Sequence, residues 1–306
     1  MRKNAVIQAM AVAGLIASAP VAHAASTLVF CSEGSPAGFD PGMYTTGTDF
    51  DASAETLFNR LTQFERGGTA VIPGLAEKWE VSEDGLIYTF HLRPGVKFHT
   101  TDYFKPSRDF NADDVLFTFA RASGEGSDMK SYTNDVKEVR KVNDFTVDVE
   151  TKGPFPILPD VLSLLYIVSK KWSEENQSTR PVDRRKGIEN AASFRANGTG
   201  PFRLRERQPN VKTSFVRNGN YWGKIEGNVV NVEYTPIGND STRVAALLSG
   251  QVDVIEPVPL QDVARINAGG KTKVMQGPEL RTIFLGMDQH RDELLYSNVK
   301  GKNPFK

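Results

Sequence analysis

Residues 71–121 constrain the fold of this chain more than any other stretch of the sequence. Within them, residues 82–85 predict a tight turn, because an Asp-Gly pair supplies the positive φ that a short reversal between two strands needs. After the turn, Tyr88, Phe90 and Leu92 alternate with polar residues, which places three large apolar groups on one face of an extended strand. The stretch therefore predicts a β-hairpin with one buried face.

A helix is predicted to follow, after the apolar alternation resumes over residues 96–98. Asn111 can cap its N-terminus, and Asp113 and Asp114 lie in its first turn, where the helix dipole favours negative charge. Paired acids can also perform acid–base chemistry in an active site. Their place at a helix N-terminus gives the simpler, structural interpretation.

Later segments continue the same mixture of strands and helices. Residues 135–150 predict a second hairpin, since apolar and polar residues alternate after a central turn. A helix that Asp240 or Ser241 caps and Gly250 closes is predicted next, and residues 260–268 predict another. Alternating strands and helices along the whole chain favour an α/β architecture.

The composition and charge exclude several classes of protein. The chain has 306 residues, 39% of them hydrophobic and 24% charged, which is typical of a globular protein with a sizeable core. Disordered and membrane-spanning classes are therefore excluded. The 37 basic and 37 acidic residues give a net charge of zero. That balance argues against nucleic acid as a partner, because binding to phosphates needs clustered Lys and Arg, and it predicts no anionic membrane surface as partner.

Residues 1–24 have the three parts of a secretory signal peptide. Arg2 and Lys3 come first, an apolar run over residues 5–21 follows, and residues 22–24, Ala-His-Ala, place small residues at the cleavage positions. We expect cleavage after Ala24 and export to the periplasm of a Gram-negative cell. A buried N-terminal helix or a membrane anchor is the alternative, but the run is too short and too rich in Ala and Gly for a span of about 20 strongly apolar residues.

The sequence contains no pattern that predicts catalysis. His91, His99 and His290 lack the short spacings of a zinc site, and no GxSxG motif is present. Residues 198–202 and 270–272 are rich in glycine but lack the spacing of a phosphate-binding loop. We therefore predict no enzyme, no metal and no cofactor. A secreted hydrolase stays as an alternative without named catalytic residues.

Three segments together resemble a known family. They are Cys31–Pro36 (CSEGSP), Pro73–Gly85 (PGLAEKWEVSEDG) and Gly198–Phe202 (GTGPF). In this order they resemble the extracytoplasmic solute-binding proteins of family 5, the receptors of ABC importers, and most closely its dipeptide-binding members. The resemblance implies the type II periplasmic binding protein fold, an α/β fold in which two lobes close on a ligand across a hinge. It covers nearly all of this chain but little more than half of a family member.

Only the first lobe, a mixed sheet with flanking helices, is expected in this chain. The resemblance implies that residues 25–287 form this lobe and that residues 288–306 begin the hinge and the second lobe, where the chain is truncated. In the relatives a returning C-terminal segment completes the first lobe. We therefore expect exposed apolar surface and an unpaired sheet edge here.

The resemblance places candidate ligand contacts at Thr45, Thr46 and Gly47, ahead of a helix predicted over residues 52–61. In the relatives this loop is extended and pairs with the main chain of a bound peptide, and glycine permits the close approach. An ordinary surface turn is the alternative from the residues alone. An arginine and an aspartate of the second lobe hold the peptide termini in the relatives. Neither has a counterpart in this chain, so we expect weak peptide binding or none.

The resemblance also implies a ligand and partners. A dipeptide or short peptide is the expected ligand. Other members of the family take oligopeptides, glutathione, haem or nickel, so these ligands stay as alternatives. The expected partners are the permease subunits of an ABC importer in the inner membrane, and the chain itself is expected to be a monomer.

Cys31 is the only cysteine, so no disulfide can form within the chain. In the relatives a cysteine at this place pairs with another at the position that matches Val252, and the partner is missing here. Cys31 is therefore either a reactive thiol or a small buried residue in a strand over residues 27–30. We predict the buried residue, because a free cysteine is usually buried and inert.

Overall fold

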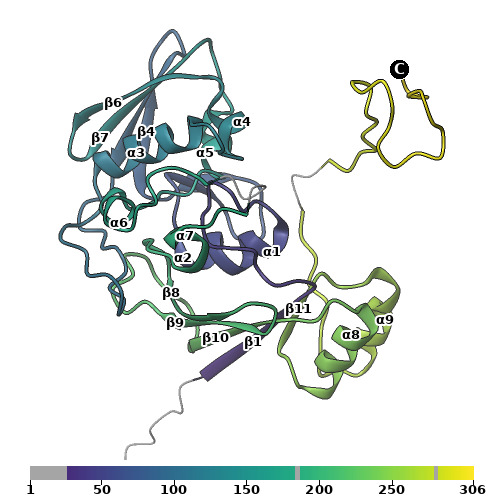
Figure 1. Cartoon of the computed structure of the whole chain (residues 1–306). Coiled ribbons are helices and arrows are strands. Elements are labelled where there is room, and N and C mark those ends of the chain that lie inside the picture. Colours follow the sequence, from purple (N-terminus) through teal and green to yellow (C-terminus); the bar gives the residue numbers. More distant parts are fainter. Residues whose placement is uncertain (1–25, 183–186, 279–281) are drawn as a thin grey trace, which may run out of the picture.

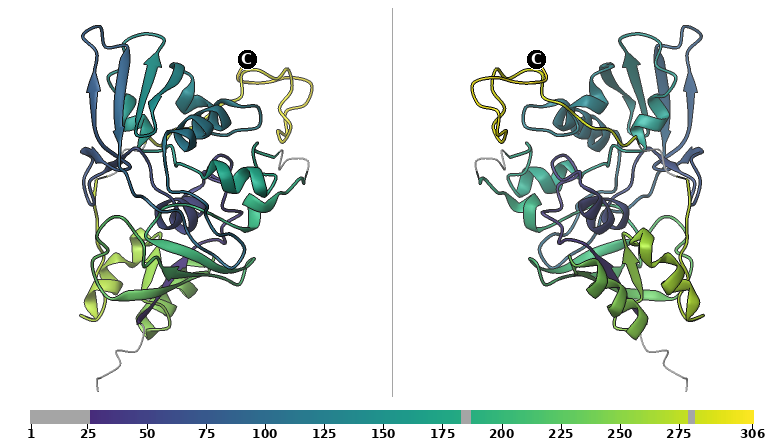
Figure 2. Two further views of the ribbon diagram at one scale, coloured as in Figure 1. Left: turned by 90° about the vertical axis from the view of Figure 1, so that its left-hand side faces the viewer. Right: turned by 90° about the vertical axis from the view of Figure 1, so that its right-hand side faces the viewer.

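The computed structural model describes residues 26–182, 187–278 and 282–306, which form two sheet-based regions and a C-terminal segment (Figure 1). One region is built on a four-stranded sheet and the other on a five-stranded sheet. A helical segment, residues 47–57, lies between them in Figures 1 and 2. Among the described residues, no helix is long and apolar enough to cross a membrane. The predicted signal peptide, residues 1–24, lies outside the described residues.

The four-stranded sheet is antiparallel and pairs its strands in the order β4-β5-β7-β6. Its strands are β4 (Ala76–Val81), β5 (Ile87–Leu92), β6 (Val136–Asn143) and β7 (Thr146–Thr151). Both hairpins are present as predicted, and Gly85 adopts the positive φ, 70°, that its turn requires. Tyr88, Phe90 and Leu92 are buried, as their alternation predicts. Residues 96–98 form no strand, although both apolar residues there are buried.

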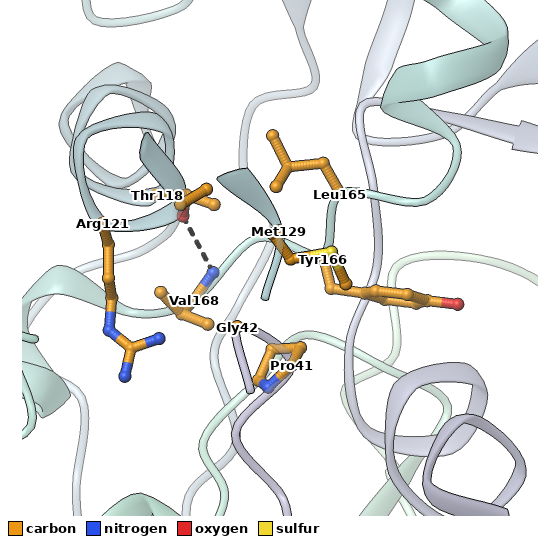
Figure 3. Close-up of a pocket in the computed structure, with 9 residues that line it drawn as sticks. Pro41, Gly42, Thr118, Arg121, Met129, Leu165, Tyr166 and Val168 are labelled. Atoms are coloured by element: carbon orange, nitrogen blue, oxygen red, sulfur yellow. Dashed lines mark hydrogen bonds between the residues drawn. The ribbon is translucent and has the colours of Figure 1, made fainter. Parts of the chain in front are cut away.

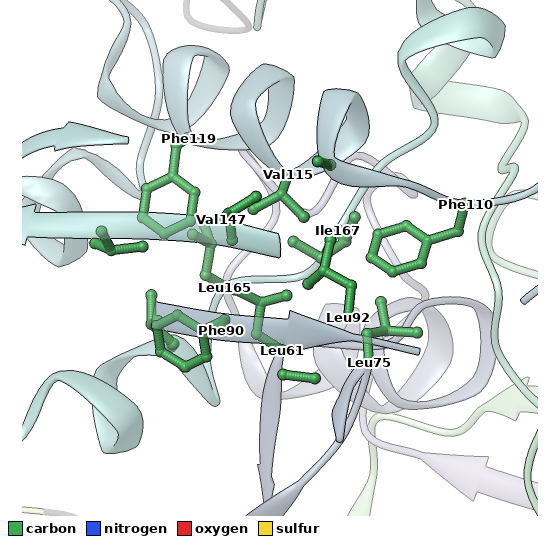
Figure 4. Close-up of a cluster of buried hydrophobic side chains, with 14 of the residues drawn as sticks. Leu61, Leu75, Phe90, Leu92, Phe110, Val115, Phe119, Val147, Leu165 and Ile167 are labelled. Atoms are coloured by element: carbon green, nitrogen blue, oxygen red, sulfur yellow. The ribbon is translucent and has the colours of Figure 1, made fainter. Parts of the chain in front are cut away.

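Helix α3 (Ala112–Ser123) covers the apolar face of this sheet. Asn111 starts it with a capping box. The Asn111 side chain accepts the N–H of Asp113 at 3.0 Å, and the Asp114 carboxylate accepts the N–H of Asn111 at 3.1 Å. The structural interpretation of the two acids is therefore correct. Apolar side chains of α3 point toward the sheet and form one buried cluster with it (Figure 4).

The other elements between the two sheets are short. The helices are α4 (Lys130–Thr133), α5 (Leu158–Leu162), α6 (Lys170–Glu175) and α7 (Ala191–Phe194). Two strands, β2 (Thr62–Phe64) and β3 (Val71–Pro73), form a small antiparallel sheet. These elements connect the strands of the larger sheets along the chain and leave the main packing to α3 and the helical segment.

The five-stranded sheet is mixed, with the order β11-β1-β10-β9-β8. Its strands are β1 (Ser26–Ser32), β8 (Phe202–Gln208), β9 (Lys212–Arg217), β10 (Val229–Pro236) and β11 (Val254–Glu256). Strand β1 is parallel to β10 and β11, whereas the other pairs are antiparallel. The helical segment packs with Phe30 and Tyr234 on one face, while Cys31 on the other face packs with the helices after β10. A mixed sheet with flanking helices is what the sequence predicts.

The helical segment begins at Gly47 and ends at Leu57, so the prediction of a helix over residues 52–61 was wrong at both ends. It consists of α1 (Gly47–Asp49), the π-helical turn η1 (Phe50–Ala54) and α2 (Glu55–Leu57). Thr46 caps its N-terminus and so starts the helix earlier than its apolar residues indicate.

The last helices follow β10 and lie beside β11 (Figure 1). They are α8 (Asp240–Ser249), the 3₁₀ turn η3 (Leu260–Asp262) and α9 (Val263–Ala268). Asn239 caps α8, since its side chain accepts the N–H of Thr242 at 2.9 Å. The predicted caps, Asp240 or Ser241, are therefore wrong by a residue or two. Gly250 closes α8 with a φ of 76°, as predicted.

Cys31 is fully buried in β1, in a cluster with Val244, Val252 and Ile266. Burial raises the pKa of its thiol, which disfavours the reactive thiolate. The prediction of a buried residue is correct. Val252, the position that matches the second cysteine of the relatives, belongs to the same cluster.

The C-terminal segment, residues 282–306, contains no helix or strand. Its residues 283–285, Ile-Phe-Leu, are 88%, 78% and 90% exposed. Apolar side chains are therefore in contact with solvent along this part of the chain. The assignment of residues 25–287 to a first lobe and of residues 288–306 to the start of a second stays a prediction.

Candidate functional site

The predicted site residues lie together where the chain enters the helical segment, at the start of α1 (Figure 1). Thr46 has an extended backbone, with φ −75° and ψ 160°. Its hydroxyl accepts the N–H of Asp49 at 3.4 Å and donates to the Asp49 carboxylate at 2.7 Å. Thr45 precedes this cap, and Gly47 is the first helical residue. The chain is thus extended at Thr46, as expected, but Gly47 already belongs to the helix. We call Thr45, Thr46 and Gly47 the entry corner.

The entry corner presents main-chain donors to solvent. Thr46 and Gly47 are exposed, and Thr45 is half-buried. Among the described residues, the backbone N–H groups of these three have no hydrogen-bond acceptor. A side chain at Gly47 would meet no atom within 4 Å, so the backbone there is open to an approaching molecule. Free N–H groups at a helix N-terminus favour oxygen acceptors, so the corner can bind a carbonyl or carboxylate through its backbone alone.

Asp40 holds the loop that leads to the entry corner. Its backbone carbonyl accepts the N–H groups of Met43 at 3.0 Å and Tyr44 at 3.1 Å. Its carboxylate accepts the N–H of Gly42 at 3.0 Å and a guanidinium N–H of Arg121 at 2.6 Å. Both side chains are buried. Sequence reasoning did not select this pair, because its members lie 81 positions apart and belong to no shared motif.

A small cavity lies beside Arg121 and is lined by α3 and the Asp40 loop. Figure 3 shows Arg121 extending from α3 next to Thr118, with Val168, Pro41 and Gly42 nearby. The N–H of Val168 donates to the Thr118 hydroxyl at 3.1 Å. The cavity volume is about 10 Å³, which is at the lower limit for one water molecule and far too small for a peptide. It is a packing gap and not a ligand site.

Residues 198–202 support the end of the helical segment. The N–H of Gly200 donates to the Leu57 carbonyl at 3.0 Å, and a Cβ at Gly198 would lie 2.0 Å from the same oxygen. His99 lies against this loop with Nε2 2.9 Å from the Gly200 oxygen, and burial lowers the pKa of His99 to about 4. The loop joins α7 to β8, which agrees with its interpretation as structure and not as a phosphate site.

A larger hollow, of about 390 Å³, opens on the five-stranded sheet beside the helical segment. Its apolar lining consists of Leu28, Phe30, Pro201, Phe202, Phe215, Ile225, Val229, Val232 and Tyr234. Four polar residues complete it: Asp51, Thr56, Arg66 and Glu226. The hollow includes none of the entry-corner residues. We call it the sheet hollow.

The described histidines, His91, His99 and His290, belong to no cluster of residues that could bind a metal ion. His91 on β5 has its Nε2 atom 3.3 Å from Oε1 of Glu80, whose side chain is exposed. His99 is buried, and its Nε2 lies beside the carbonyl oxygen of Gly200. Within the parts of the chain that the structure describes, no three His, Cys, Asp or Glu side chains come together in a way that could hold a metal ion.

Comparison with known proteins gives the family. A profile of the "Bacterial extracellular solute-binding proteins, family 5 Middle" matches residues 70–306. Because this match covers most of the chain, the chain belongs to family 5 of the bacterial extracellular solute-binding proteins. It is a family of binding proteins and not of enzymes, as predicted.

Individual relatives carry the names of different ligands. Di/tripeptide-binding protein 1 of Pseudomonas aeruginosa is 42% identical over 289 residues, which cover 85% of this chain and 51% of that protein. Heme-binding protein A of Haemophilus influenzae is 32% identical over 291 residues, which cover 90% of this chain and 51% of that protein. The chain therefore spans about half the length of the curated relatives it matches.

A solved structure supports the fold. The ABC transporter-associated periplasmic binding protein DppA from Helicobacter pylori, in complex with the peptide STSA, matches with a TM-score of 0.69 and 30% identity. The match covers 79% of this chain and 48% of that chain. It confirms the type II periplasmic binding protein fold, of which this chain covers about half. The ligand contacts of Thr45, Thr46 and Gly47 stay a prediction.

Proposed function

We propose that this chain is part of the substrate-binding component of an ABC importer and binds short peptides, above all dipeptides, in the periplasm. The exposed main-chain donors of the entry corner are the observation that carries the proposal. Membership of family 5 and the di/tripeptide-binding relative at 42% identity support it. The proposed partners are permease subunits in the inner membrane, and the chain acts as a monomer.

The chemistry of the entry corner suits ligands with varied side chains. A hydrogen bond from a backbone N–H to a peptide oxygen is independent of the side chains of the peptide. We assign the N–H groups of Thr45, Thr46 and Gly47 to oxygens of the bound peptide. The Thr46 hydroxyl donates no proton to the ligand, because it already donates to the Asp49 carboxylate.

Residues 26–306 alone are proposed to bind peptide weakly. Charge-assisted hydrogen bonds are roughly twice as strong as neutral ones. The entry corner offers neutral donors, and the resemblance places the groups for the charged peptide termini in a second lobe. Calorimetry of residues 26–306 with alanyl-alanine should give a dissociation constant larger than about 1 μM. Micromolar or tighter binding would contradict this part of the proposal.

A hybrid protein tests the ligand class. In it, the chain continues from Lys306 with the remaining half of the Pseudomonas aeruginosa relative, and a cooperative urea transition shows that it is folded. We expect alanyl-alanine to bind this hybrid with a dissociation constant of about 1 μM or less. Haem is the second candidate, because a relative 32% identical to the chain carries that name. Binding of haem without binding of peptide would replace the peptide assignment.

Two variants at Gly47 separate the role of its N–H from that of its open surroundings. Gly47→Pro removes the N–H, and proline is tolerated here because this is the first helical position and Thr46 has the extended backbone that precedes a proline. Gly47→Ala keeps the N–H, and its methyl group meets open space. We expect the proline variant of the hybrid to lose about tenfold in peptide affinity and the alanine variant to match the parent. Equal losses would indicate crowding and not a lost donor.

A further inference from the structure

A buried ion pair joins the loop before the entry corner to helix α3. Asp40 belongs to the loop that leads to the corner, and Arg121 belongs to the last turn of α3 on the four-stranded region. Their side chains are only 1% and 5% exposed. Both Nη atoms of the guanidinium donate to the two carboxylate oxygens, Nη1 at 2.6 Å. This two-point contact fixes direction as well as distance.

The loop is folded around the carboxylate of this pair. Oδ1 of Asp40 accepts the N–H of Gly42 at 3.0 Å, while the backbone oxygen of Asp40 accepts from the two residues that follow. A Cβ at Gly42 would lie 2.8 Å from Nη1 of Arg121, so a side chain there would displace the guanidinium. Tyr44, the last residue of the turn, is followed directly by the entry corner. The position of the corner therefore depends on where the carboxylate lies.

Arg121 is fixed independently of the loop. Its Nε donates to the Ser178 carbonyl at 3.2 Å, and α3 is packed into the buried cluster of the four-stranded sheet. Burying a charged pair is costly unless its geometry is satisfied. The loop cannot move relative to α3 without leaving two buried charges unpaired.

We propose that the Asp40–Arg121 pair positions the entry corner. Through this pair, helix α3 sets the position of the N–H groups of Thr46 and Gly47, although α3 itself does not contact the peptide. Asp40 and Arg121 are positioning residues and not ligand contacts. The role in peptide binding rests on the proposed function, whereas the role in ordering the corner does not.

Helix α3 offers a matched control, because a second Asp–Arg pair lies at its other end. Asp114 is fully buried, and its carboxylate accepts from Arg108 at 2.6 and 2.9 Å. It belongs to the first turn of α3, whereas Arg121 belongs to the last. Asp40→Asn and Asp114→Asn each remove one carboxylate charge, keep the side-chain shape and leave a guanidinium without its full partner.

Amide NMR of the full chain measures the order of the entry corner without any peptide. We expect Asp40→Asn to lower the ¹⁵N heteronuclear NOE of Thr45, Thr46 and Gly47, while Asp114→Asn leaves these values at the parent level. Urea unfolding checks that both variants are folded. If Asp40→Asn does not fold, Arg121→Lys replaces it, since it keeps the charge and loses the two-point contact. Unchanged NOE values, or equal losses in the control, overturn the proposal.

Peptide affinity in the hybrid is a separate readout. We expect Asp40→Asn to weaken alanyl-alanine binding by about tenfold or more, and Asp114→Asn by less than about threefold. Equal affinities of the parent and Asp40→Asn hybrids overturn the role in binding. A parent hybrid that binds no peptide refutes the proposed function, and the NMR result then decides the positioning role by itself.

Discussion

The four-stranded and five-stranded regions enclose their apolar residues to different degrees. In the four-stranded region Phe90 and Val147 are fully buried in the cluster beneath α3 (Figure 4), and Val149 is fully buried in the same cluster. On the five-stranded sheet Phe202 and Val229 are only partly buried, and they line the open sheet hollow. The first region therefore has a closed core, whereas the second keeps apolar surface that the described residues do not cover.

The edge strands of the two sheets also differ. Edge strand β4 carries the Lys78–Glu80 ion pair, and Arg140 on edge strand β6 pairs with Glu150. Charged side chains on edge strands hinder pairing with another chain. Edge strand β11 has three residues, and its Val254 is 38% exposed. The four-stranded sheet thus carries charged pairs on both of its edge strands, whereas the five-stranded sheet has exposed charges on edge strand β8, at Arg205 and Glu206, and a short edge strand in β11.

Truncating one phenylalanine in each region should give the largest contrast. Phe90→Ala removes a fully buried ring and should lower the free energy of unfolding by about 4 kcal/mol. Phe202→Ala removes a partly exposed ring at the open sheet hollow and should cost about 1 kcal/mol. Urea unfolding of the full chain measures both. Equal losses would mean that the sheet hollow is as well packed as the closed core.

The contact between the five-stranded region and the helical segment is expected to be nearly as sensitive to substitution as the closed core. A Cβ at Gly198 would lie 2.0 Å from the Leu57 carbonyl oxygen, so Gly198→Ala should cost about 3 kcal/mol of unfolding free energy. Gly219→Ala is the control, because a Cβ at Gly219 would meet no atom within 4 Å. Thermal unfolding compares the two. If Gly198→Ala is as stable as its control, the backbone at Gly198 and Leu57 can shift to accommodate a methyl group.

A disulfide should strengthen the five-stranded region. Cys31 and Val252 lie in one buried cluster, so we expect Val252→Cys to form a disulfide with Cys31 under oxidising conditions. The gain in unfolding free energy should be about 2 kcal/mol, because the closed loop is long but engineered disulfides often deliver less than expected. Thiol counting after denaturation reports the bond. Two free thiols in the oxidised variant would show that the side chains do not meet.

A pH effect of similar or smaller size should come from His99. Its pKa is lowered from 6.5 to about 4, so the unfolded chain binds a proton there that the folded chain does not. Stability should therefore fall as pH drops below 6.5, by about 2 kcal/mol between pH 7 and pH 5. Urea midpoints across this range measure the slope. His99→Gln should flatten it, and an unchanged slope in that variant would assign the effect to other groups.

Local patterns were sufficient to predict the two hairpins and the helix start of the four-stranded region, but not the pairing of β5 with β7 that joins the hairpins. The turn at Gly85 and the cap at Asn111 each depend on neighbours within a few residues, and both are present. The five-stranded sheet depends on distant pairings, such as Ser26 with Val229, which no local pattern contains. The sequence predicted a strand over residues 27–30, but it gave no prediction for β9 or β10 and none for the order of the strands.

At the entry corner, too, local sequence patterns predicted only part of the structure. The resemblance suggested Thr45–Gly47 as candidate contacts. The sequence did not predict that Gly47 begins the helix, because the apolar periodicity of the helix starts several residues after the Thr46 cap. The Asp40–Arg121 pair could not be predicted from the sequence, because the two residues lie 81 positions apart and only the folded structure brings them together. Long-range ion pairs of this kind need the structure.

Hydrogen exchange at the entry corner tests the central claim most directly. Amide exchange of Thr45, Thr46 and Gly47 in the hybrid would be followed with and without alanyl-alanine. We predict that the bound peptide slows exchange at these amides, because its oxygens accept their N–H groups, while the turn at residues 82–85 exchanges as before. Saturating peptide that leaves exchange at Thr45, Thr46 and Gly47 unchanged would contradict the assignment of this corner to the ligand.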